Sequence, residues 1–115
     1  MVVEKDSWIS QIRKGVVEIA ILGLLARGEM YGSELVTTLS LQPELAISAG
    51  TIYPLLARLR RAGVIESVWR ESPVGPPRKY YTLTAAGREE LAGMATAWDS
   101  VSAGINAVLE GRARG

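Results

Sequence analysis

Apolar residues near the start of the chain recur at helical spacing around most of a helix circumference. This pattern predicts a helix over residues 7–28, with Ser7 as its N-cap and Gly28 as a stop that can adopt a left-handed conformation. One face carries Ile12, Val16, Ile19 and Gly23, and a second carries Val17, Ile21, Leu24 and Leu25. Because both faces are apolar, we expect the helix to be covered from two sides, by its own domain and by a partner.

Two shorter helices are predicted next from apolar residues spaced three and four apart. The first, over residues 31–40, carries Tyr31, Leu35 and Leu39 at this spacing. The second, over residues 48–62, buries Ile52, Leu55, Leu56 and Leu59. Gly63 ends it. Its start is left open, because Pro54 fits a helix that begins at Thr51 but costs a hydrogen bond in one that begins at Ser48.

Two runs rich in β-forming residues follow, at residues 64–70 and 78–83. The seven residues between them include three prolines and a glycine, which forbid a helix and predict a stiff hairpin tip. In the second run, alternation places Tyr81 and Leu83 on one face and Tyr80 on the other, so one tyrosine packs inward. A helix followed by such a hairpin predicts a recognition helix and a β-wing.

The last helix is predicted to begin after Thr84, its cap, and to extend to about Leu109. Apolar residues recur along it at intervals of three and four, which is the a/d pattern of nearly three heptads. They are Leu91, Met94, Trp98, Val101, Ile105 and Val108. A helix of about 25 residues is about 38 Å long, too long for a small head to cover. We therefore expect these six residues to form a dimer interface with a second copy of the chain.

Positive charge is concentrated in the third helix and the hairpin. Residues 48–81 contain six basic and two acidic residues, a net charge of +4, whereas the whole chain carries +1. A phosphate backbone attracts such a patch, so double-stranded DNA is the expected partner. The alternative is a solvated helix face and a charged edge that protects the hairpin from pairing.

The expected DNA contacts come from the third helix and the wing. Thr51, Arg58 and Arg61 lie away from the buried face and are free to enter a major groove. Tyr53 can present its hydroxyl to a phosphate, and the cations on the two arms of the hairpin can straddle the backbone or reach a minor groove. The expected DNA-binding residues are Ser48, Thr51, Tyr53, Arg58, Arg61, Arg70, Arg78 and Lys79.

Composition argues against an enzyme. The chain has no cysteine and no histidine, which removes disulfides, thiol nucleophiles, imidazole acid–base chemistry and the usual zinc ligands. Glu89 and Glu90 are adjacent on a helix, point about 100° apart and cannot jointly flank a substrate. We expect no catalytic residue, no metal and no cofactor. The longest apolar run, residues 15–26, is too short for a bilayer, and no signal peptide is recognisable, so a cytoplasmic location is expected.

Three segments resemble the PadR family of transcriptional regulators: MYGSEL at residues 30–35, GTIYPLLARLRRAGVI at residues 50–65 and RKYYTLTAAG at residues 78–87. The resemblance covers residues 12–109. It implies an α+β, mostly α fold with a winged helix-turn-helix head, a long C-terminal dimerisation helix and homodimeric binding to DNA. The single C-terminal helix resembles the short (LmrR-like) subfamily.

A ligand site is implied by the multidrug-binding member of that subfamily. There, a tryptophan pair lines a pore between the subunits, which corresponds to Trp98 in this chain. The expected ligand-binding residues are Trp98, Ile12, Gly15, Ile19, Leu91, Met94, Ala95 and Ser102, with Trp8 nearby. Glu18 and Glu90 fall near the same space and would favour cationic ligands. The alternative is that tryptophan and methionine simply fill the interface, as they do in many interface cores.

Together these arguments divide the chain in two. Residues 1–84 form a winged helix-turn-helix DNA-binding domain, whose N-terminal helix also contacts the dimer interface, and residues 85–115 form the dimerisation helix and a short tail. The predicted function is a repressor that binds a palindromic operator as a homodimer and is released by a planar aromatic small molecule. The alternatives are a winged-helix module for protein contacts and a small-molecule carrier, neither of which would bind an operator.

Overall fold

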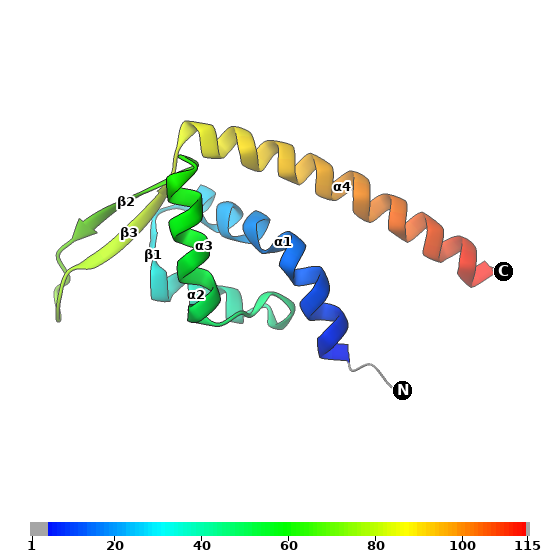
Figure 1. Ribbon diagram of the computed structural model, residues 1–115, viewed down its shortest axis with the longest axis horizontal. Coiled ribbons are helices and arrows are strands. Elements are labelled where there is room, and N and C mark those ends of the chain that lie inside the picture. The colour runs from blue at the N-terminus through cyan, green and yellow to red at the C-terminus, as the bar shows by residue number, and fades with distance from the viewer. Residues whose placement is uncertain (1–4, 115) are drawn as a thin grey trace.

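The computed structural model describes the backbone of residues 5–114 and the side chains of residues 8–111. A small helical head with a β-hairpin wing is followed by one long helix (Figure 1). The elements are α1 (Lys5–Arg27), β1 (Met30–Tyr31), α2 (Gly32–Ser40), the 3-10 turn η1 (Pro43–Leu45), α3 (Ala49–Arg61), β2 (Ile65–Arg70), β3 (Arg78–Leu83) and α4 (Ala85–Arg114). The predicted fold class is confirmed.

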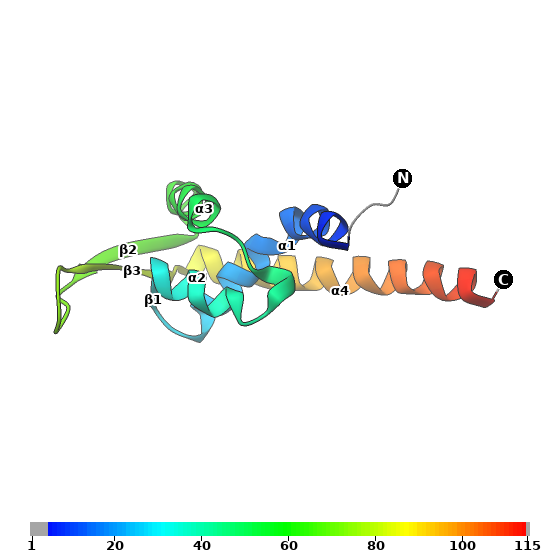
Figure 2. The same cartoon turned by 90° about the horizontal axis from the view of Figure 1, so that it is seen from below.

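The sheet has three antiparallel strands in the order β1-β3-β2. β2 and β3 form the predicted hairpin and pair from Ile65 with Leu83 to Arg70 with Arg78. The hairpin projects away from the helices, so its tip is surrounded by solvent (Figures 1 and 2). β1 was not predicted. Met30 was assigned to no element and Tyr31 to the start of a predicted helix, and only their pairing with β3 makes them a strand.

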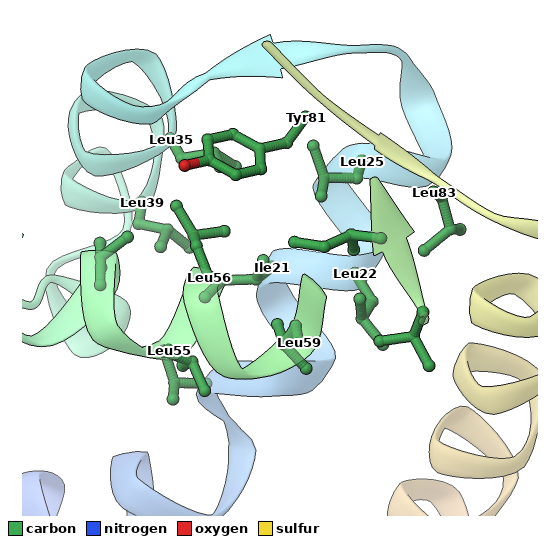
Figure 3. Close-up of a cluster of buried hydrophobic side chains, with 14 residues drawn as sticks. Ile21, Leu22, Leu25, Leu35, Leu39, Leu55, Leu56, Leu59, Tyr81 and Leu83 are labelled. Carbon is green, nitrogen blue, oxygen red and sulfur yellow. The ribbon is translucent and has the colours of Figure 1, made fainter. Parts of the chain in front are cut away.

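One apolar core holds the helices and strands of the head together. Six side chains are almost completely excluded from solvent and come from four different elements: Ile21, Leu22, Leu35, Ile52, Leu56 and Ile65. α1 passes through the middle of this cluster, with α2, α3 and the sheet around it (Figure 3). Full burial of one such side chain contributes about 1.5–3 kcal/mol. The buried face predicted for α3 is confirmed, and of the two tyrosines that strand alternation separates, Tyr81 is the one that packs inward.

α3 begins at Ala49, with Ser48 as its N-cap, which settles the start left open by the sequence. Pro54 therefore lies inside the helix, and the carbonyl that it leaves without a helical partner belongs to Gly50, which is exposed. The predicted stop is also confirmed, because Gly63 has a φ of 80°. Backbone hydrogen bonds from Val64 to Leu59 and from Gly63 to Arg60 close the helix as a Schellman motif.

Three predicted helix ends are wrong. Ser7 is not an N-cap, because the helix already includes Lys5. The residues directly before Ser7 are polar, and polar residues are accepted in the first turn of a helix. Tyr31 is the N-cap of α2 rather than part of it, because its extended backbone pairs in β1. α4 continues to Arg114, five residues beyond the predicted Leu109, because this stretch contains no proline and Gly111 keeps a helical conformation without a positive φ. α1 does end before Gly28, but with a φ of 156° rather than in the left-handed helical region.

Thr84 joins the end of α3 to the start of α4. Its hydroxyl oxygen accepts a hydrogen bond from the Gly87 N–H at 3.0 Å, as expected of an N-cap, and donates one to the Gly63 carbonyl at 2.7 Å. Its own N–H donates to the Val64 carbonyl at 3.1 Å. Gly87 packs so closely on this carbonyl that a Cβ would overlap its oxygen. The first turn of α4 is therefore fixed against the end of α3.

Beyond this joint α4 runs past the head and diverges from α1 (Figure 1). Its apolar seam is open to solvent in the single chain: Trp98, Val101, Ile105 and Val108 are 44%, 56%, 54% and 72% exposed. Among the described residues no helix is long and apolar enough to cross a membrane.

The close contact of Gly87 with the Val64 carbonyl predicts opposite effects for alanine substitution at two glycines of α4. Gly87→Ala should lower the free energy of unfolding by about 1–3 kcal/mol, because the methyl group overlaps a backbone carbonyl that cannot move freely. Gly93→Ala is the control, since a Cβ there meets no atom within 4 Å, and it should be neutral or stabilise by up to about 1 kcal/mol. Equal midpoints of urea unfolding for the two variants would show that the joint is not tight.

Candidate nucleic-acid interface

The outer surface of α3 is set by the residues that it buries. Successive residues turn by about 100°, so the face opposite Ile52 and Leu59 consists of small residues with one cation. These are Gly50, Pro54, Ala57 and Arg61. Thr51 and Arg58 lie on one flank, and Tyr53 lies on the other. A major groove can therefore approach the backbone of α3 closely, with long side chains on its two edges.

Tyr53 is packed against the start of α2. A Cβ at Gly32 would overlap the Tyr53 ring, so the absence of a side chain there makes room for the tyrosine. Behind it lies Tyr81, whose pKa is raised above its ordinary value mainly by burial, with a further contribution from Tyr53. Tyr81 is thus a neutral core residue, and Tyr53, 43% exposed, is the tyrosine at the surface.

Aromatic rings hold the cations of the wing in place. The Arg78 guanidinium lies 4.3 Å from the centroid of the Tyr31 ring, and Tyr31 meets Tyr80 edge-on with centroids 5.4 Å apart. Arg70 lies 5.9 Å from the Tyr80 centroid. Exposed cation–π contacts of this kind contribute about 0.5–1 kcal/mol each. The two arginines contact these rings and remain open to solvent.

The strand register places the predicted wing cations on two faces. Arg70 pairs with Arg78 and Trp69 pairs with Lys79, so alternation separates the two arginines from the lysine. Lys79 lies 5.9 Å from the Trp69 centroid and shares its face with buried Tyr81. The wing can therefore present cations on both sides of a phosphate backbone.

Two ion pairs connect this surface to acidic residues of α1 and of the turn after it. Arg58 of α3 donates from Nη2 to Oε1 of Glu18 in α1. Arg70 of β2 donates to Glu29 at 2.9 Å. Both pairs join residues about forty positions apart, which no local pattern could have indicated.

Arg13 and Lys14 also contribute to the surface, and the sequence argument missed them. They line a groove of about 300 Å³ between α1 and the start of α3, together with Ser48 and Thr51. Arg13 is held there by a 2.7 Å hydrogen bond from Nε to the carbonyl of Glu44. Both lie outside residues 48–81, the segment in which the positive charge is concentrated. Two adjacent basic residues next to the apolar run of residues 15–26 were the available signal.

A separate cleft of about 380 Å³ lies between α1 and α4. It is lined by Ile12, Gly15, Val16, Glu18, Ile19, Met94, Ala97, Trp98, Val101 and Ile105. Five predicted ligand residues are among them: Trp98, Ile12, Gly15, Ile19 and Met94. Four others, Leu91, Ala95, Ser102 and Trp8, do not line it.

Helix pitch and local bonding account for two of these four residues. Ala97, one turn before Val101, lines the cleft within one chain, and Ala95, two residues earlier on the helix, is turned away from it by about 200°. The Ser102 hydroxyl donates to the carbonyl of Trp98 at 2.7 Å and so turns back on its own helix. Of the two predicted carboxylates, Glu18 borders the cleft, whereas Glu90 borders a different hollow, next to the end of α3. Within residues 5–114 no three acidic side chains gather closely enough to hold a metal ion.

Comparison with known proteins identifies relatives of this chain. The sequence model described as "Transcriptional regulator PadR-like family" matches residues 21–93. A PadR-like transcriptional regulator from Bacillus cereus is 40% identical, covering 86% of this chain and 96% of its own, with a TM-score of 0.79. A padr family transcriptional regulator from Eggerthella lenta is 33% identical over 90% of both chains, with a TM-score of 0.81. Bacillus subtilis PadR in complex with operator DNA is 32% identical, covering 70% of this chain and 47% of its own, with a TM-score of 0.64.

Proposed function

Because the chain belongs to the PadR-like family of transcriptional regulators, we propose that it is a repressor that binds a palindromic operator as a homodimer through α3 and the β2–β3 wing. The observation that carries this proposal is the surface on which α3, the wing cations and the groove at Ser48 and Thr51 lie together. The operator complex of the Bacillus subtilis relative supports DNA as the ligand.

The proposed contacts divide between base reading and phosphate binding. α3 enters the major groove with Thr51, Arg58 and Arg61, and the N-terminal Ser48 and flanking Tyr53 bind the backbone. Arg70, Arg78 and Lys79 of the wing lie against phosphates on either side, and Arg13 extends this strip onto α1. This division gives the two groups of residues different effects on sequence preference.

A homodimer follows from the exposed seam of α4. Burial of one large apolar side chain contributes about 1.5–3 kcal/mol, so four that are about half exposed or more favour a covering surface. A second copy supplies the same seam by twofold symmetry, and the pairing makes two recognition helices available to a palindrome. The seam comprises Leu91, Met94, Trp98, Val101, Ile105 and Val108.

Ligand release is the finer part of the proposal. The cleft between α1 and α4 is mostly apolar, is bordered by Trp98 and adjoins the seam, so a planar aromatic compound has both a stacking surface and room. A ligand there separates α1 from the seam and changes the spacing of the two recognition helices. It acts as an inducer if it prefers the spacing that the operator disfavours.

The first test concerns DNA. Lys79→Ala and Arg70→Ala should weaken binding to every duplex similarly and reduce the salt dependence by about one counterion each, because phosphate contacts do not depend on sequence. Thr51→Ala and Arg58→Ala should instead change which bases are preferred, by about 1–3 kcal/mol for a bidentate contact. Mobility shifts at several salt concentrations, on a duplex selected by the wild type and on a scrambled duplex, measure both effects.

Two results would contradict this division. Equal losses on both duplexes for all four variants would mean that α3 does not read bases. Salt-independent or absent binding by the wild type would exclude DNA as the ligand and favour a module for protein contacts or a small-molecule carrier.

The second test concerns the seam. The wild type should sediment as a dimer at micromolar concentration, and Val101→Asp with Ile105→Asp should sediment as a monomer or unfold, because two charges per chain enter an apolar interface. Ala103→Asp with Ala107→Asp is the matched control, since both are exposed and lie on the opposite face of α4. A stable monomeric wild type would overturn the homodimer.

The third test concerns the cleft. With Trp8 and Trp69 replaced by Phe, Trp98 is the single fluorescent reporter, and a planar aromatic dye should quench it by stacking. Trp98→Ala should lower the dye affinity by at least about tenfold, or about 1.4 kcal/mol, and saturating dye should weaken operator binding. Unchanged dye affinity in Trp98→Ala, or unchanged operator affinity with dye, would remove ligand release while leaving DNA binding intact.

A further inference from the structure

The two ion pairs of the interface differ in what else supports the arginine. Arg70 contacts Glu29 and also lies over the Tyr80 ring, so removal of the carboxylate leaves an aromatic support. Among the described residues, Arg58 lies over no aromatic ring, and Glu18 is its ion-pair partner. The position of Arg58 therefore depends on one carboxylate.

The bond between them leaves most of the guanidinium free. It uses only Nη2 of Arg58 and one oxygen of Glu18. Within the described part of the chain, Nε and Nη1 have no hydrogen-bond acceptor, and the Arg58 side chain is 60% exposed while that of Glu18 is 25% exposed. An arginine in this state is held at one edge and offers its remaining N–H groups to solvent.

Glu18 is itself firmly placed. It follows Val17, which is buried, and lies one turn before Ile21 and Leu22, which are fully buried in the core of the head. The α1 backbone at Glu18 is therefore fixed relative to α3. An exposed ion pair adds little to folding stability, so stability alone gives a weak reason for such an arrangement.

We propose that Glu18 is a positioning residue for DNA recognition: it holds the Arg58 guanidinium on the flank of α3 so that its free N–H groups meet a base pair in the major groove. This inference rests on the proposed function. A flexible arginine loses rotamer freedom when it binds, and an arginine that is already oriented loses less. The benefit falls on bidentate base contacts, which need a defined orientation, rather than on phosphate contacts, which do not.

The flank on which Arg58 lies supports a DNA-facing role. Thr51 is on the same flank two turns earlier, and it lines the groove that also contains Arg13 and Lys14 of α1. Cations from two helices thus border this side of α3, where a DNA strand that enters along α3 would pass. Glu18 is an acidic residue among these cations, and its carboxylate forms an ion pair with Arg58.

The experiment compares Kd for a duplex selected by the wild type with Kd for a scrambled duplex of the same composition. Glu18→Gln keeps the shape of the side chain and removes its charge, and it should lower the ratio of the two affinities about tenfold, as the loss of one base contact does. Arg58→Ala should lower the ratio similarly. The double variant should be no worse than Arg58→Ala, because Glu18 acts only through Arg58.

Two matched controls remove the same charge elsewhere. Glu29→Gln should leave the ratio unchanged, because Arg70 is supported by Tyr80 and binds phosphate. Glu89→Gln, exposed on α4, should also leave it unchanged. Arg58→Lys is a second variant for the same question: lysine keeps the charge but lacks the planar fork, so it should lower the ratio while binding to the scrambled duplex is retained.

Several outcomes would overturn the proposal without affecting the proposed function. One is an affinity ratio for Glu18→Gln equal to that for Glu89→Gln. Another is stronger binding of Glu18→Gln to both duplexes by the same factor, which would make Glu18 only a competitor of DNA for Arg58. A wild-type ratio in Arg58→Lys would exclude an oriented fork. Absence of sequence preference in the wild type itself would overturn the proposed function and this inference together.

Discussion

The packing of α1 in the apolar core is the constraint on which the other features depend. Ile21 and Leu22 are completely buried and lie between α3 and the sheet (Figure 3). Because α3 turns Ile52 and Leu56 toward this core, its opposite face has to point outward. The orientation of the candidate interface is thus a consequence of core packing and requires no contact made by the interface itself.

The same helix brings acidic groups to a basic surface. α1 provides Glu18, and the turn after it provides Glu29, each paired with an arginine of α3 or the wing. The aromatic residues Tyr31 and Tyr80 support the arginines of the wing from below. The basic surface proposed to bind phosphates is therefore held by contacts within the chain itself, which lowers the entropy that such binding would cost.

Local chemistry explains which parts of the structure could be predicted from the sequence. The end of α3 and the hairpin are marked by Gly63 and by the proline-rich tip, and Thr84 is recognisable as a cap, so the end of α3, both strands of the hairpin and the start of α4 were predicted to within one residue. The start of α3 was left open because of Pro54. β1 exists only through pairing with a strand fifty residues later, and the Glu18–Arg58 pair spans forty residues. Neither leaves a periodic signal.

The cleft shows a different limit. The ligand residues were expected by resemblance for a pore between two subunits, and within one chain Ala97 lines the cleft whereas Ala95 does not. A shift of two residues on a helix turns a side chain by about 200°, so alignment alone could not separate the two. The predicted roles of the DNA, dimer and ligand residues remain predictions, whereas the positions of these residues are now known.

The hydroxyl of Thr84 has a mechanical consequence. It bonds Gly63, which ends α3, to the first turn of α4, and Gly87 packs on the Val64 carbonyl, so the start of α4 is tied to the residues that directly follow α3. α4 has thirty residues and is about 45 Å long. Because of that length, a displacement of about 4 Å at the far end of α4 corresponds to a tilt of only about 5° at the Thr84 joint. A partner that holds the distal end of α4 therefore limits the angle between α4 and the head to a few degrees, and α3, which is shorter and ends beside the joint, moves by less than the end of α4 does.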